Sequence, residues 1–181
     1  PLSSSSAASD VYKRQLSNLD AQLRQEMRAE LRELQQRLGL TVVYVTHDQA
    51  EAMSMADQVV LLHQGRVEQC ATPRALYAQP ATTFAARFIG TPAMNLVQLQ
   101  DGAIAGSSVR LPAPTGAAWL GLRPEAVALS GEARVPAQVV ALEYLGADVV
   151  LRCQVGSEQI TVRAPGQQAV QAGQALPLAL S

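Results

Sequence analysis

The sequence predicts an α/β segment followed by an all-β barrel or sandwich. Of its 181 residues, 48% are hydrophobic and 16% are charged, which is typical of a globular protein with a buried core. Up to about Ile89, helical spacing of apolar residues alternates with continuous apolar runs, the pattern of an α/β layer. From Asn95 onward the apolar runs are short and separated by turns, as in all-β folds. Ten of the twelve glycines lie at or after Gly90, so the class changes near that residue.

The α/β segment is expected to open with a long amphipathic helix, which Gly39 would end in the left-handed conformation. The β-branched run of residues 41–46 then predicts a strand buried on both faces. A second helix over residues 48–56 and a strand over residues 58–62 follow, so the sheet should be mostly parallel. The apolar stripe of the first helix consists of Leu19, Leu23, Met27, Leu31, Leu34 and Leu38.

A short hairpin strand over residues 66–69 and two short helices over residues 73–78 and 82–88 should complete this part. Pro73 fits the first position of the former helix, behind Thr72 as its N-cap. The β-part is expected to hold strands at residues 95–100, 108–111, 119–122, 135–144, 149–155, 159–163 and 176–180.

Charge and cysteine content exclude several classes of function. Fourteen basic and fifteen acidic residues give a net charge of -1, which leaves no surplus for holding nucleic acid. Among residues 95–181 only Trp119 and Tyr144 are aromatic, too few for a surface that stacks single-stranded bases. Cys70 and Cys153 lie in apolar sequence without a CxxC pattern, so we expect structural thiols and no metal site.

The first fifteen residues differ from the rest in composition. They contain a serine run and Lys13, the single lysine of the chain, whereas all later basic residues are arginines. We therefore interpret residues 1–15 as a non-native scar without ordered structure and begin the fold at Leu16.

Two short motifs allow both a structural and a functional interpretation. His47 follows the predicted strand of residues 41–46, and ligands of open α/β sheets bind beyond the carboxyl ends of strands. An imidazole there can donate a hydrogen bond to a phosphate oxygen. The alternative is a capping box formed by Thr46 and Gln49, with His47 beside it. Residues 17–20 likewise fit an S-x-x-D capping box before the first helix.

Six short motifs occur along the chain: LSNLDA at 16–21, VTHDQAEAM at 45–53, AD at 56–57, GRVEQ at 65–69, FIGTP at 88–92 and GLRPE at 121–125. Taken together, these motifs strongly resemble the back half of an ATP-binding cassette (ABC) ATPase. The order and spacing are most similar to the importers of the maltose and glycerol-3-phosphate group. The resemblance implies part of a P-loop NTPase-type ATPase core over residues 16–90 and an OB-like (TOBE) β-domain over residues 91–181.

The resemblance also implies a role for particular residues. His47 would be the switch histidine that contacts the γ-phosphate of ATP. Arg123, Pro124 and Glu125 match the motif of the small β-domain and would be structural there, with a contact between subunits as a further possibility. The D-loop, which crosses the ATPase dimer in this family, would consist of Ser17, Asn18, Leu19 and Asp20.

The departures from the family pattern define what this chain lacks. The sequence holds no G-x-x-x-x-G-K-[ST] phosphate loop, no LSGGQ-like stretch and no strand ending in Asp-Glu. We therefore expect a truncated gene product that neither hydrolyses ATP nor binds it tightly, although the intact family member would use ATP and Mg²⁺.

The resemblance implies partners and a location as well. The intact protein would form a homodimer on the cytoplasmic face of the inner membrane, beneath two membrane-spanning permease subunits that are served by a periplasmic solute-binding protein. No nucleic acid partner is expected. The alternative function is an isolated OB-like module that binds a ligand or supports dimerisation or regulation without ATPase activity.

Overall fold

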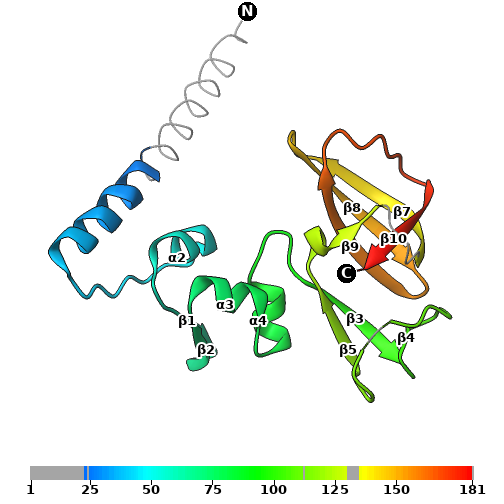
Figure 1. Ribbon diagram of the computed structural model, residues 1–181, viewed down its shortest axis with the longest axis horizontal. Coiled ribbons are helices and arrows are strands. Elements are labelled where there is room, and N and C mark those ends of the chain that lie inside the picture. The colour runs from blue at the N-terminus through cyan, green and yellow to red at the C-terminus, as the bar shows by residue number, and fades with distance from the viewer. Residues whose placement is uncertain (1–22, 24, 112, 130–134, 181) are drawn as a thin grey trace, which may run out of the picture. The chain divides into compact units, whose positions relative to one another are not determined.

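The computed structural model describes residues 23, 25–111, 113–129 and 135–180. The chain divides into two compact units, Pro1–Val59 and Val60–Ser181, and each is described here by itself. In Figure 1 the first unit contains the blue helix and α2, and the second contains the short helices α3 and α4 and the β-strands beyond them.

The first unit contains the predicted amphipathic helix, which is helical over residues 25–38. Gly39 ends it with a φ of +63°, the left-handed conformation expected of a C-terminal glycine. Helix α2, Gln49–Met55, follows close to its predicted bounds. The apolar stripe of the first helix is open to solvent, with Met27 and Leu38 each more than half exposed.

Residues 41–46 do not form the buried strand that their composition predicts. They have no regular secondary structure, and Val43 and Val45 are each 89% exposed. A β-branched run becomes a strand only where a neighbouring strand takes up its backbone hydrogen bonds. Among the described residues no strand pairs with this segment, so the prediction is wrong for this structure.

The second unit begins with the predicted hairpin. Strands β1, Val59–His63, and β2, Arg66–Ala71, form a two-stranded sheet. The intervening Gln64 and Gly65 have φ values of 50° and 74°, as in the type I′ turn that suits antiparallel hairpins.

Two short helices follow the hairpin, and the first of them has the predicted cap. Helix α3, Pro73–Ala78, begins behind Thr72, whose side chain accepts from the amide of Ala75. Helix α4, Thr83–Phe88, is capped in the same way by Thr82. Leu76 is fully buried, so α3 has one strongly anchored side chain.

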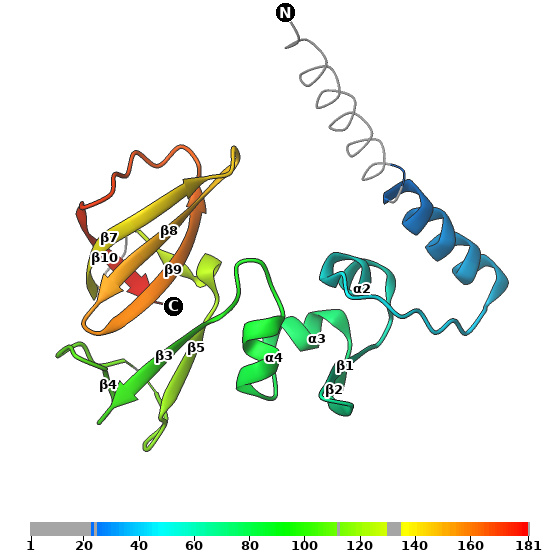
Figure 2. The same cartoon turned by 180° about the vertical axis from the view of Figure 1, so that it is seen from behind.

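The β-part contains a three-stranded and a five-stranded sheet. The first has the order β4-β3-β5, with β3 at Asn95–Gln100, β4 at Ala103–Ile104 and β5 at Trp119–Leu122. The second is a nearly closed antiparallel barrel of the order β6-β10-β7-β8-β9 (Figure 2). Its strands are β6 at Val127–Ala128, β7 at Val135–Tyr144, β8 at Asp148–Val155, β9 at Glu158–Pro165 and β10 at Ala175–Leu180.

Alternation of inward and outward side chains builds the barrel core. In β8 every second residue from Val149 to Val155 is buried, and Val155 pairs with Glu158 at the start of β9. The predicted strand over residues 108–111 is wrong, because only a single bridge joins Arg110 to Ala103. The fully buried core side chains include Leu151, Cys153, Ile160, Val162 and Leu178.

The two cysteines lie in different environments. Cys153 is fully buried in β8, and this burial raises the pKa of its thiol to about 11. Cys70 lies on β2 and is exposed, so the predicted apolar environment is wrong for this residue. Among the described residues, no group of three or more His, Cys, Asp or Glu side chains has a metal-binding arrangement.

Candidate functional site

The turn that carries His47 is fixed by hydrogen bonds on both sides of the histidine. Thr46 Oγ1 accepts the backbone amide of Asp48 at 2.9 Å. Asp48 Oδ1 accepts the amides of Ala50 at 2.7 Å and of Glu51 at 3.2 Å, so it caps α2. The predicted capping box with Thr46 as the cap is therefore wrong. Asp48 is the better cap because its carboxylate is charged and meets the positive end of the helix.

Glu51, in the first turn of α2, accepts hydrogen bonds from three side chains. Its carboxylate accepts from Thr46 Oγ1 at 2.5 Å, from Arg28 Nη2 at 2.9 Å and from the hydroxyl of Tyr44 at 3.3 Å. The hydrogen bond from Thr46, followed by that from Arg28, lowers the pKa of Glu51 below its ordinary value. A second ion pair, from Arg32 to Asp57, ties the same helix to the residues after α2.

His47 itself is exposed at the tip of this turn. Its imidazole can therefore reach a ligand and donate one hydrogen bond to an anionic oxygen. The neighbouring carboxylates of Asp48 and Glu51 are occupied by amides, Thr46 and Arg28, which leaves them poorly suited to hold Mg²⁺. The described residues can therefore supply one contact to a phosphate, but they form neither a complete ATP site nor a Mg²⁺ site.

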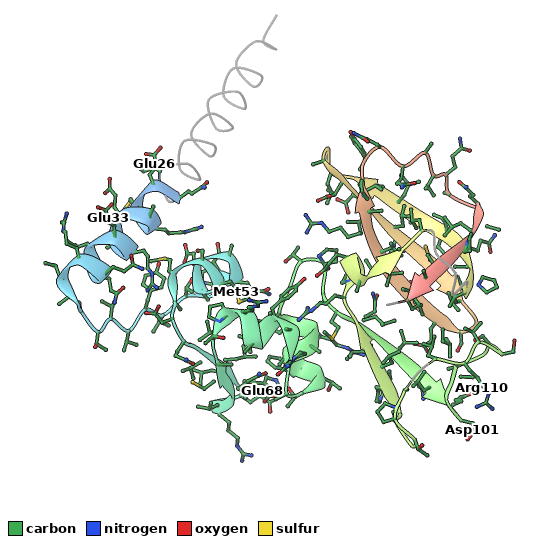
Figure 3. All side chains as sticks on the ribbon, in the orientation of Figure 1. Glu26, Glu33, Met53, Glu68, Asp101 and Arg110 are labelled. Carbon is green, nitrogen blue, oxygen red and sulfur yellow. The ribbon has the colours of Figure 1, made fainter. Side chains whose placement is uncertain are left out.

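The other predicted nucleotide-site residues, Ser17, Asn18, Leu19 and Asp20, lie outside the described residues. Their assignment to a D-loop stays a prediction. The described part of the long helix begins a few residues after them, and its exposed polar face includes Glu26 and Glu33, both labelled in Figure 3.

The second predicted motif, at residues 123–125, joins the β-part to helix α3. Arg123 is only 9% exposed and donates through Nη1 to the carbonyl oxygen of Ile89 at 2.5 Å. Its Nε and Nη2 both donate to the carbonyl oxygen of Tyr77, the former at 3.1 Å. The guanidinium lies 3.8 Å from the centre of the Tyr77 ring, a cation–π contact. We call these contacts of Arg123 with Tyr77 and Ile89 the arginine clasp.

Pro124 and Glu125 complete the clasp. Pro124 is buried at the start of the 3₁₀ helix η1, Pro124–Ala126. Glu125 accepts from the hydroxyl of Tyr77 at 2.5 Å, and burial together with this bond raises the pKa of Tyr77. Gly90 has a φ of +109°, and a Cβ there would lie 2.9 Å from Arg123 Nη1, so the clasp requires glycine at this position.

Sequence reasoning missed the partners of both motifs. Nothing in the sequence connects Arg28 with Glu51, which are 23 positions apart, or Tyr77 with Arg123, which are 46 positions apart. The one available signal was Arg123, which precedes Pro-Glu in an otherwise apolar stretch. Such an arginine must find acceptors wherever the fold buries it.

Comparisons with known proteins find relatives that match nearly the whole chain. A model of the TOBE domain matches residues 120–181. The sn-glycerol-3-phosphate import ATP-binding protein UgpC of Chromohalobacter salexigens is 49% identical over 185 residues, which cover 94% of this chain and 50% of that protein. The proteins of the same name from Salmonella choleraesuis and Rhizobium meliloti are 43% and 47% identical, over 94% and 78% of this chain and over 52% and 42% of their own lengths.

The chain belongs to the family of ABC importer ATP-binding proteins. It spans about half the length of the curated relatives it matches. The arginine clasp lies partly in its TOBE domain, because Arg123 is inside the matched residues whereas Tyr77 and Ile89 precede them. Within the part of the chain that the structure describes, no helix is long and apolar enough to span a lipid bilayer.

Proposed function

We propose that residues 16–181 act within the ATP-hydrolysing subunit of a bacterial ABC importer whose solute is sn-glycerol-3-phosphate or a sugar. The observation that carries the proposal is the 49% identity, across nearly the whole chain, to a protein named for ATP binding and sn-glycerol-3-phosphate import. The similarity matters because the motifs at residues 17–20 and 46–49, taken alone, also fit plain helix caps.

In this function His47 donates a hydrogen bond to the γ-phosphate and helps to position the attacking water. Phosphoryl transfer depends on positioning and on stabilising the charge of the phosphoryl oxygens. The exposed imidazole on a turn fixed by Thr46 and Asp48 suits both tasks. Residues of the subunit outside this sequence would supply the phosphate loop and the ligands of Mg²⁺.

The intact subunit would work as a homodimer under two membrane-spanning permease subunits, at the cytoplasmic face of the inner membrane. A periplasmic solute-binding protein would deliver the solute. ATP would close the dimer, and Ser17–Asp20 of one subunit would then meet the nucleotide site of the other. A nucleic acid partner is not part of this proposal, because the chain carries a net charge of -1.

A hybrid subunit tests the proposal directly. In it, residues 16–181 replace the aligned half of the Chromohalobacter relative, so that the relative contributes the phosphate loop. We expect the hybrid to hydrolyse ATP and to restore sn-glycerol-3-phosphate uptake in cells that lack their own import ATPase. The unmodified relative serves as the positive control. A folded hybrid without ATPase activity, beside an active control, would refute the proposed function.

The 181-residue chain alone is expected not to bind ATP with micromolar affinity. It offers one histidine to the terminal phosphate and no loop of backbone amides for the others. Isothermal titration with ATP and Mg²⁺ should therefore give no saturable heat in that range, whereas the hybrid should bind. Tight binding by the chain alone would show that it holds a nucleotide site of another kind.

A further inference from the structure

Glu51 makes contacts that capping of α2 does not account for. In a capping box, the side chain of the third helical residue bonds back to the amide of the N-cap residue. Here the amide of the N-cap, Asp48, is taken by Thr46 Oγ1. The carboxylate of Glu51 reaches past that amide and accepts from the hydroxyl of Thr46 at 2.5 Å. Thr46 is thus held from both sides, immediately before His47.

The two carboxylate oxygens of Glu51 face different parts of the first unit. Oε2 accepts from Thr46 and Tyr44 in the segment before His47, whereas Oε1 pairs with Arg28 on the helix of residues 25–38. The side chains of Glu51 and Arg28 are only 14% and 23% exposed, so solvent screens this ion pair less than it screens a surface pair. Glu51 therefore joins the segment before His47 to the long helix, beside a longer ion pair of Arg28 with Asp48 at 3.7 Å.

We infer that Glu51 is a positioning residue, which holds the turn of residues 46–48, and thereby the imidazole of His47, against the helix of residues 25–38. The inference rests on the proposed function, in which His47 contacts the terminal phosphate of ATP. An exposed imidazole on a free loop would lose orientational freedom each time it met its ligand, and a turn fixed in advance avoids that loss. Through Arg28, movement of the helix is passed to the histidine turn.

Nuclear magnetic resonance of the full chain without nucleotide tests the inference, because His47 and His63 are its only histidines. Thr46→Val removes the hydroxyl and keeps the pair of Glu51 with Arg28. Glu51→Gln removes the charge and keeps the size. In both variants we expect the His47 imidazole signal to shift and the amide order parameters of residues 46–48 to fall from about 0.85 to below about 0.6. The signal of His63, which stacks on Phe84 at 3.7 Å, should not move.

Glu33→Gln is the matched control, since it makes the same charge change on the exposed face of the helix of residues 25–38 (Figure 3). Wild-type order and shift of His47 in both test variants would overturn the inference. So would an equal change in the control, or a variant Glu51→Gln that unfolds α2 while Thr46→Val leaves His47 rigid.

The hybrid subunit separates this inference from the proposed function. There, Glu51→Gln should lower kcat for ATP hydrolysis and leave KM for ATP unchanged, whereas Glu33→Gln should change neither. A hybrid without activity, combined with a loosened His47 in the chain, would refute the proposed function alone. If the hybrid is active, its kcat is unchanged by Glu51→Gln and the His47 signal of the chain does not shift in that variant, the positioning role alone is refuted.

Discussion

Replacing His47 with alanine in the hybrid subunit is expected to lower kcat for ATP hydrolysis by a factor of about 10² to 10³, the usual effect of removing one donor that stabilises developing charge. KM for ATP should stay nearly unchanged. The relative's phosphate loop would still hold the other phosphates, so the loss would fall on the reaction step. Steady-state hydrolysis at saturating Mg²⁺ and ATP measures both constants.

Two further variants sharpen this prediction. His47→Gln keeps one N–H donor and should recover part of the lost rate, because a single hydrogen bond to the γ-phosphate is the contribution assigned to the imidazole. His63→Ala removes the other histidine, whose ring stacks on that of Phe84 in helix α4, and should leave kcat unchanged. If His47→Ala and His63→Ala had the same small effect, the exposed imidazole would be no more than a surface residue beside a helix cap.

Most strands of the β-part could be predicted from the sequence. β3, β5 and β7 begin and end at the predicted residues, and helix α3 does as well. The reason is that alternation of apolar and polar residues, Thr-Pro caps and glycine turns are local signals, and here the local preference agrees with the tertiary environment. Strands β4 and β6 were missed because a strand of two residues carries no period.

The segment of residues 41–46 shows the limit of the same method. Its composition is that of a buried strand, yet Val43 and Val45 are almost fully exposed. Periodicity and β-branching indicate that a segment can form a strand and bury its side chains. They do not indicate whether a strand that pairs with it is present. The exposed stripe of the helix of residues 25–38 has the same origin, since its spacing predicts an apolar face without naming what covers it.

Only part of the candidate site could be predicted from the sequence. The sequence places His47 after an apolar run and before a helix, which suffices to single it out. The network that fixes its turn depends on Arg28, and the choice of Asp48 over Thr46 as cap depends on where the backbone turns. Both depend on the backbone geometry, because Thr and Asp are both residue types that cap helices.

Replacing Arg123 with alanine is expected to lower the free energy of unfolding of the Val60–Ser181 unit by about 3 kcal/mol. The change leaves the carbonyl oxygens of Tyr77 and Ile89 without their charged donors and removes a cation–π contact worth about 1 kcal/mol. Urea unfolding followed by the fluorescence of Trp119, the only tryptophan, measures the loss.

Arg110→Ala provides the matched control, because Arg110 is exposed and its side chain donates to the carbonyl oxygen of Asp101 at 3.0 Å (Figure 3). It should cost less than about 0.5 kcal/mol, as surface substitutions usually do. Arg123→Lys should fall between the two, since an ammonium group can reach a carbonyl but lacks the planar fork that meets two carbonyls and a ring together.

The clasp further predicts where stability is lost. The barrel has its own core around Leu151 and Ile160, to which Arg123 contributes no bond, so amides of β8 should keep most of their protection from hydrogen exchange in Arg123→Ala. The amide of Gln79, which closes α3 on Ala75, should lose protection first, because Tyr77 would no longer tie that helix to the β-part. Equal losses in α3 and β8 would instead make Arg123 an ordinary member of one cooperative core, and the arginine clasp would not be a separate link between helix and barrel.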